Sequence, residues 1–267
     1  MSLKVHHLNC ATLNPIIGQM VCHCLLIESP EGLILVDTGL GTKDIEHTKK
    51  RLDSTFRNFV KPKLDMQETA LYQIQKMGFA ATDIKHIVLT HLHADHAGGL
   101  SDFPKAKIHV LRYEYNNIYN IDKTLPGYSL QQFKHEINWC IHDIYGEKWK
   151  GFNKSNILEK NEEILLVPLR GHTSGHCGVA ILTDSGWLFH CGDAYYHRDT
   201  IKKDPSETPF GVRLTQYFID FNSDDRRNNQ YRLHQFYTAN KNQIRFICSH
   251  DKVEFNACIN GAEPNNC

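Results

Sequence analysis

The chain has 267 residues, a length that suits one large domain or two small ones. Thirty Lys and Arg residues balance thirty Asp and Glu residues, so the formal net charge is zero and the bulk charge does not favour a nucleic acid partner. With 41% hydrophobic and 22% charged residues the composition is that of a globular protein, and no apolar run approaches the roughly 18 residues of a membrane helix. Residues 1–10 also lack the pattern of a secretory signal. We therefore expect a soluble, cytoplasmic protein.

Histidine is the one anomaly of the composition, with seventeen residues, and it is the commonest transition-metal ligand. Nine cysteines are scattered without the spacing of a disulfide framework, so we expect reduced thiols. Cys22 and Cys24 are two residues apart, and we expect them to face a core from one strand rather than to bind a metal.

Hydrophobic periodicity predicts both strands and helices in the first half of the chain. Strands are expected at residues 21–28, 33–36, 84–90 and 107–111. The turn-like residues 29–32 join the first two strands as a hairpin. Asp65 with Glu68 three residues later resembles a capping box, which predicts a helix of about three turns that ends at Gly78.

The second half begins with residues 112–156, which are rich in aromatic residues. We expect this segment to be a helical insertion whose aromatic side chains wall an apolar pocket. Strands resume at residues 164–169, 178–183, 187–191 and 244–248. Residues 184–186 predict a tight hairpin, and residues 223–240 predict a helix with Leu233, Phe236 and Tyr237 facing inward. The alternation of elements, without internal repeats, predicts one α/β domain over residues 1–267.

Four potential metal ligands lie within six positions, where the strand at 84–90 ends: His91, His93, Asp95 and His96. Packing does not explain this crowding, because each buried polar group needs a partner. The alternating His91 and His93 can reach one ion, while Asp95 and His96 turn toward a neighbouring ion. Nitrogen and oxygen donors of this kind suit zinc.

Three further candidates each follow a predicted strand: His172, Asp193 and His250. Taken singly, each residue type at such a place is more often an ordinary loop or turn residue. Asp37 has two readings as well, as the start of a turn or as an acceptor that orients the metal-binding loop. His176 is expected to be a loop residue that supports the site.

The chain resembles the metallo-β-lactamase superfamily of metal-dependent hydrolases from about Cys22 to His250. The likeness follows five motifs in order: Leu35-Val36-Asp37-Thr38-Gly39, His91-x-His93-x-Asp95-His96, His172, Asp193 and His250. It implies a four-layer αββα sandwich. It also implies two zinc ions, with iron, manganese or cobalt as alternatives. By this resemblance one ion is held by His91, His93 and His172, the other by Asp95, His96 and His250, and Asp193 bridges the two.

Such a pair of ions lowers the pKa of a bridging water, so we expect a hydroxide nucleophile that opens a lactone or ester carbonyl. Asp95 is a candidate catalytic residue that shuttles a proton. The residues Asp193 to Tyr196 resemble the Asp-x-x-Tyr pattern of N-acyl homoserine lactone lactonases, in which the tyrosine contacts the lactone carbonyl. Tyr196 is therefore a second catalytic candidate, with a packing role as its alternative. The stretch 9–15 differs from those enzymes and leaves the acyl-chain preference open.

Other functions compete with a lactonase: a thioesterase or phosphoesterase of the same superfamily, or a non-catalytic metal-binding module. Only seventeen residues follow His250, too few for the added helical domain of glyoxalase II-like thioesterases. We expect a small-molecule substrate and neither a nucleic acid nor a membrane as partner. The oligomeric state stays open, with a homodimer among the options.

Overall fold

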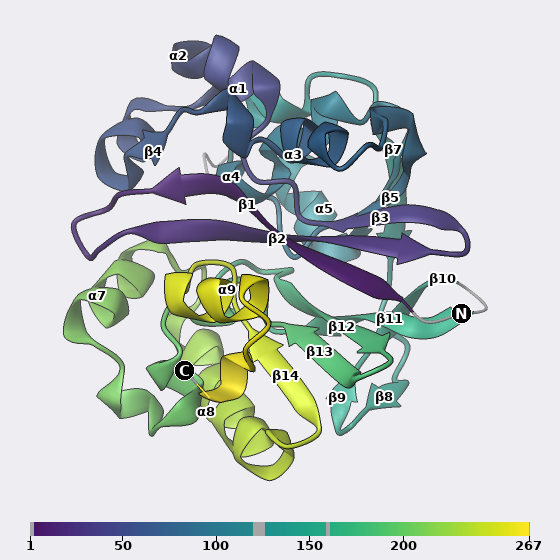
Figure 1. The fold of residues 1–267 in the computed structure, drawn as a ribbon. Helices are drawn as coiled ribbons and strands as arrows, with labels where there is room; N and C mark the ends of the chain where they lie inside the picture. The colour runs from purple at the N-terminus through teal and green to yellow at the C-terminus, as the bar shows by residue number, and fades with distance from the viewer. Residues whose placement is uncertain (1–2, 120–125, 159–160, 267) are drawn as a thin grey trace. The chain divides into compact units, whose positions relative to one another are not determined.

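The computed structural model describes residues 3–119, 126–158 and 161–266. The chain folds as two compact units, the first made of Met1–Val110 and Asn117–Cys140 and the second of Leu111–Asn116 and Ile141–Cys267. Each unit contains a sheet and helices (Figure 1). The single domain expected from the sequence stays a prediction.

A seven-stranded mixed sheet forms the body of the first unit, in the order β4-β1-β2-β3-β5-β6-β7. Its strands are β1 (Lys4–Leu13), β2 (Met20–Ser29), β3 (Gly32–Val36), β4 (Pro62–Lys63), β5 (Ile84–Val88), β6 (Lys107–Leu111) and β7 (Asn138–His142). β1, β2 and β3 pair antiparallel, which confirms the hairpin, and β3, β5 and β6 pair parallel. β1 was not predicted, because His6, His7 and Asn9 interrupt its apolar pattern.

The helices of the first unit are short and include α1 (Thr42–Glu46), α2 (Thr48–Arg51), α3 (Ala70–Lys76) and α4 (Ala94–Ala97). The capping box predicted at Asp65 and Glu68 is wrong. Asp65 caps only a 3-10 turn, while Thr69 caps α3 by accepting a hydrogen bond from the Tyr72 amide. Glu68 instead accepts a hydrogen bond from the Thr12 amide at 2.7 Å, so its carboxylate joins this segment to β1.

A five-stranded sheet forms the body of the second unit, in the order β10-β11-β12-β13-β14. Its strands are β10 (Ser155–Leu158), β11 (Asn161–Pro168), β12 (Cys177–Thr183), β13 (Gly186–His190) and β14 (Ile244–Ile247), and its helices are α6 (Asp199–Lys202), α7 (Phe210–Ile219), α8 (Ser223–Asn240) and α9 (Lys252–Ile259). The hairpin between β12 and β13 is confirmed, and β14 joins β13 in parallel. Polar loops therefore follow β11, β13 and β14, as expected.

The core of the second unit lies where α8 packs on its sheet. Leu233, Phe236 and Tyr237 of α8 are buried, which confirms the predicted inner face. The Phe236 ring lies 6.3 Å from that of Phe189 on β13 and 5.5 Å from that of Phe246 on β14, centroid to centroid. Aromatic packing of this kind makes the strands that end at the candidate site residues a rigid support.

The expectation of a helical insertion over residues 112–156 needs correction. Only α5 (Arg112–Tyr119) and one 3-10 turn are helical, and β7, β8 (Lys148–Trp149), β9 (Phe152–Asn153) and the start of β10 follow, while residues 120–125 lie outside the described residues. Trp149 and Phe152 do not wall a pocket, because both are buried in the core against Phe189, at ring separations of 5.1 and 6.4 Å. Aromatic content indicated burial here, and the two-residue turn at 150–151 favoured strands.

Two predictions from composition agree with the structure. None of the described cysteines forms a disulfide, and Cys22 and Cys24 are buried in the first unit. Within the described ranges, no helix has the length and apolar character needed to cross a membrane.

Candidate metal centre

The His-rich motif of the first unit lies in the loop that begins where β5 ends and continues through α4. His91, His93 and His96 are buried, and Asp95 is 8% exposed. The His91 ring centroid lies 4.6 Å from that of His93 and 4.0 Å from that of His96. The loop thus gathers three imidazoles and a carboxylate in one small, mostly buried region.

Asp37 holds this loop in place from the end of β3. Its carboxylate accepts hydrogen bonds from the Thr90 amide at 2.8 Å and from the Thr90 hydroxyl at 2.7 Å. It also accepts from His96 Nδ1 at 2.9 Å, so the proton of that imidazole is on Nδ1 and the lone pair is on Nε2. Asp37 adopts a left-handed conformation, with φ of 55°, that L-residues rarely take. Asp37 therefore orients the His-rich loop and does more than begin a turn, as predicted, while metal binding by that loop stays a prediction.

A buried ion pair supports the same loop, and sequence reasoning missed it. Asp44 on α1 accepts a hydrogen bond from Arg51 Nε at 2.6 Å and from Gln132 Nε2 at 3.1 Å. Arg51 donates in turn to the Gly98 carbonyl at 3.3 Å, and Gln132 donates to the Ala94 carbonyl at 3.0 Å. Burial raises the pKa of the Asp44 carboxyl, against the opposing effect of Arg51. Nothing in the local sequence signals this network, because its members are far apart in the chain.

His93 is confined from a second side by the segment at Gly127 and Tyr128. The Ala94 amide donates to the Gly127 carbonyl at 2.9 Å, and the rings of His93 and Tyr128 meet edge to face at 4.8 Å. Gly127 has φ of 84°, and a Cβ there would lie 2.8 Å from the His93 ring. Only glycine therefore fits beside this imidazole.

The second unit brings together the other three candidate ligands. His172 follows β11, Asp193 follows β13 and His250 follows β14. Asp193 Oδ2 lies 3.3 Å from His172 Nε2 and 3.1 Å from His250 Nε2. All three side chains are buried, so two imidazole nitrogens converge on one carboxylate oxygen away from solvent.

His176 joins two of these loops. Its Nδ1 donates to the Leu169 carbonyl at 2.9 Å, and its Nε2 accepts from the Asp193 amide at 2.8 Å. The two backbone partners fix the tautomer, because a carbonyl accepts and an amide donates. His176 therefore supports the site, as expected, and holds the Asp193 turn against the end of β11.

Glu114 is a further support that sequence reasoning missed. It is fully buried, and its carboxylate accepts hydrogen bonds from the Thr173 hydroxyl at 2.6 Å and from the Gly175 amide at 3.2 Å. The loop that carries His172 is thereby held at its carboxyl-terminal side.

Tyr196 lies in the second unit beside two of the candidate ligands. Its ring meets the His172 ring at 5.9 Å and the His250 ring at 5.0 Å, both edge to face. The residue is 7% exposed. These contacts agree with the expected place of Tyr196 next to the ligands, and they leave its part in catalysis a prediction.

The donor set of each unit fits a transition metal. Imidazole nitrogens and carboxylate oxygens are zinc ligands, and the lone pair on His96 Nε2 and the convergence of His172 and His250 on Asp193 are arrangements that a cation stabilises. The residues would also suit iron, manganese or cobalt.

Comparison with known proteins agrees with this chemistry. The family model described as the metallo-beta-lactamase superfamily matches residues 17–233, which is most of the chain. The chain belongs to the metallo-β-lactamase superfamily. Within this superfamily it is 36% identical to a probable metallo-hydrolase of Mycobacterium tuberculosis over 252 residues, which cover 93% of this chain and 80% of the relative. It is 28% identical to an N-acyl homoserine lactonase of Bacillus cereus over 194 residues, 70% of this chain and 68% of that protein.

Solved structures share the metallo-β-lactamase fold. A variant of AiiA from Bacillus thuringiensis, with N-decanoyl-L-homoserine bound at its active site, has a TM-score of 0.75 at 22% identity and covers 97% of each chain. An N-acyl homoserine lactone hydrolase with N-hexanoyl-L-homoserine at its catalytic metal centre has a TM-score of 0.74 at 21% identity over 96% of each chain. The protein is therefore a metal-dependent hydrolase of the superfamily, with an α/β fold of two mixed sheets flanked by helices, as the sequence predicted.

Proposed function

We propose that the protein is a dinuclear metallohydrolase that opens the carbonyl of a lactone or ester, with N-acyl homoserine lactones as its substrates. The ligands in this proposal are His91, His93, Asp95, His96, His172, Asp193 and His250. The observation that carries it is the convergence of His172 and His250 on one Asp193 oxygen, at 3.3 and 3.1 Å, because a bridging carboxylate needs neighbours on both sides.

Two bound transition-metal ions would supply an activated water and a Lewis acid for the carbonyl oxygen. The protein's own task is to keep the ligands in place. Asp37 sets the tautomer of His96, and His176 fixes the backbone that carries Asp193. Because these partners are buried, their hydrogen bonds are not in competition with water.

Asp95 and Tyr196 are the proposed catalytic residues. Asp95 is the most exposed of the four candidate ligands in the His-rich loop. Its carboxylate can therefore receive a proton from the attacking water and pass it to the departing alkoxide. The Tyr196 hydroxyl would donate a hydrogen bond to the oxygen on which negative charge develops. Its ring contacts with His172 and His250 place the side chain beside two proposed ligands, which supports this role.

A lactone substrate is supported by three likenesses. Tyr196 stands three residues after Asp193, as in the lactonase pattern, and relatives of 27 to 28% identity are N-acyl homoserine lactonases. Two of the solved structures that share the fold hold an N-acyl-L-homoserine at the active site or catalytic metal centre. A neutral net charge is also compatible with an uncharged lactone ring.

The test is a specificity panel with measured metal content. Purified protein is assayed on N-acyl homoserine lactones, aryl esters, thioesters and phosphoesters, and elemental analysis counts its metal ions. We expect about two ions per chain and the best kcat/KM on lactones. Turnover of a phosphoester or thioester, without any lactone activity, would refute the assignment as a lactonase and leave the assignment as a metallohydrolase unchanged.

Variants of the His-rich loop test the site itself. Asp95→Asn and His93→Ala should abolish hydrolysis while the far-UV circular dichroism stays that of the wild type, because both residues act at the metals. Lys105→Ala, an exposed change in the same unit, is the matched control and should keep activity. Near-normal turnover of either loop variant at equal metal content would contradict the proposed ligand set.

A further inference from the structure

A groove on the second unit is lined by side chains of α7 and α8, and none of the proposed metal ligands lines it. Its volume is about 390 Å³, which is within the range of small-molecule sites. The lining combines apolar and cationic side chains, among them Phe210, Arg213, Leu214 and Tyr217 of α7 and Arg227 and Tyr231 of α8. The groove therefore offers two kinds of contact to one ligand.

Three apolar side chains of α7 form one stripe along the groove. Phe210, Leu214 and Tyr217 are spaced by four and three residues, so they lie on one face over two turns, about 10 Å of helix. Their exposed fractions are 70%, 43% and 60%. Val212 and Gln216 of the same helix are buried, so α7 packs on the protein with its opposite face. An apolar surface gathered in this way is typical of a binding site.

The same face of α7 carries a cation without a counter-ion. Arg213 is exposed, and its guanidinium makes no ion pair or hydrogen bond with the part of the chain that the structure describes. Arg227 is paired with Asp224, but both side chains are exposed, and such surface pairs are weak. None of the described residues that line the groove is acidic. A ligand with one carboxylate therefore meets positive charge there.

A buried hydrogen-bond network fixes the base of the groove. Arg226 donates from Nε to Asp220 at 2.6 Å and from a second nitrogen to Gln230 Oε1 at 2.7 Å. Gln230 donates in turn to the Ala194 carbonyl at 2.8 Å. Asp220 neutralises the charge of Arg226, so this arginine is not free to bind an anionic ligand. Because the network is buried and bonded, the shape of the groove is set before a ligand binds, which lowers the cost of binding.

We propose that this groove binds a medium-chain monocarboxylate, a molecule with an apolar chain and one anionic end. The chain lies along the stripe of Phe210, Leu214 and Tyr217, and the carboxylate accepts charge-assisted hydrogen bonds from Arg213. A neutral chain gives the guanidinium no partner, and a short carboxylate leaves the apolar stripe in water, so both parts of the ligand are needed. No proposed metal ligand takes part, so this site does not depend on the proposed hydrolysis.

Isothermal titration calorimetry of the metal-loaded protein with sodium octanoate at neutral pH tests the proposal. We expect saturable binding with a Kd of about 1 mM or below. 1-Octanol has the chain without the charge, and acetate has the charge without the chain, so each should bind about tenfold more weakly or less. Arg213→Gln should weaken octanoate binding by about tenfold and leave octanol binding unchanged. Leu214→Asp should abolish the binding of both, because it places a carboxylate in the apolar stripe.

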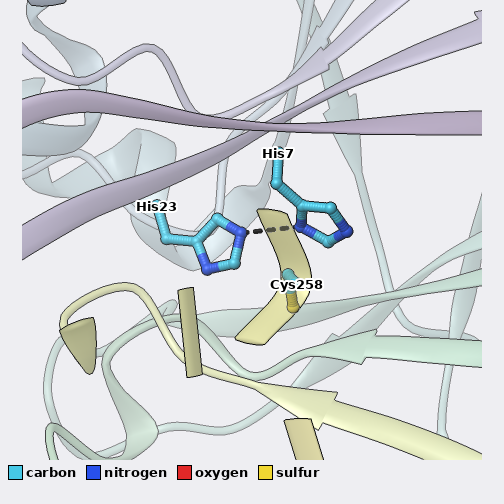
Figure 2. A group of neighbouring side chains, drawn as sticks. All are labelled: His7, His23 and Cys258. Atoms are coloured by element: carbon cyan, nitrogen blue, oxygen red, sulfur yellow. Dashed lines mark hydrogen bonds between the residues drawn. The ribbon is translucent and has the colours of Figure 1, made fainter. Parts of the chain in front are cut away.

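Two control variants separate the groove from other cations of the protein. Lys241→Gln removes an exposed cation at the carboxyl-terminal end of α8, outside the groove lining, and should leave octanoate affinity unchanged. An imidazole pair can also attract a carboxylate when it is protonated. The first unit contains such a pair, His7 and His23, whose Nδ1 and Nε2 atoms are 2.8 Å apart (Figure 2). His7→Gln should nevertheless bind octanoate as the wild type does.

Three results would overturn the proposal. These are a wild-type protein without saturable octanoate binding, an octanoate affinity that is the same in Arg213→Gln and wild type, and a tenfold loss of affinity in either control variant. A second copy of the chain is the alternative occupant of this face. It would appear in analytical ultracentrifugation as a dimer that Leu214→Asp dissociates, without octanoate binding, and would likewise refute the carboxylate site.

Discussion

Glu254 on α9 offers a test of how the loop around His250 is stabilised. Its side chain is fully buried, accepts a hydrogen bond from the Cys248 amide at 3.0 Å and lies 3.3 Å from the Tyr195 hydroxyl. Burial first, and the neighbouring Asp251 charge second, raise the pKa of Glu254 from 4.5 to about 8. The folded protein therefore keeps a proton on this carboxyl at neutral pH that the unfolded chain has released.

The consequence for stability has a definite sign. Between pH 4.5 and about 8 the folded state binds more protons than the unfolded state, so this carboxyl makes the free energy of unfolding fall as the pH rises. Each pH unit in that window costs about 1.4 kcal/mol, and the stabilisation is fully present only below pH 4.5. Glu254→Gln keeps the shape of the protonated side chain and removes its titration.

The measurement is urea unfolding of both proteins at equal metal content, at a series of pH values inside the window. Because other titrations are common to both, the unfolding free energy of Glu254→Gln relative to wild type should rise by about 3 kcal/mol over two pH units. Glu207→Gln, at an exposed position of the same unit, should follow the wild type. Parallel profiles of wild type and Glu254→Gln would refute the protonated, buried carboxyl.

Four further changes have expected outcomes. Tyr196→Phe should lower kcat/KM on lactones by about 10²-fold or less with unchanged metal content, and a larger loss would show that the metals carry less of the charge than expected. Asp193→Ala should lower the metal content found by elemental analysis, since a bridging ligand serves both ions. Arg51→Met leaves Asp44 buried without its cation and should cost about 3–5 kcal/mol of unfolding free energy in urea, whereas a change below 1 kcal/mol would contradict the importance of that pair. Phe189→Ala, in the core under α8, should cost about 3–5 kcal/mol in the same assay.

The sequence by itself predicted the features that depend on neighbours along the chain. The hairpin between β2 and β3, the one between β12 and β13 and the inner face of α8 follow from side-chain periodicity and turn residues, which act over a few positions. The metal motif belongs to this class too, because His91, His93, Asp95 and His96 lie within a single loop. The motif order then predicted the superfamily, which the comparisons confirm.

Only the tertiary structure decided which distant residues support the ligands. Arg51 and Gln132 bond to backbone carbonyls of the His-rich segment from positions 47 and 38 residues away in sequence, and Asp44 accepts hydrogen bonds from both. No local pattern could connect such distant residues. The sequence predicted that Trp149 and Phe152 line a pocket, because aromatic content alone does not show which way a side chain points. In the structure, β8 and β9 direct both rings into the core. Burial decides such cases, since the cost of an unpartnered polar group or an exposed ring depends on what the rest of the chain brings against it.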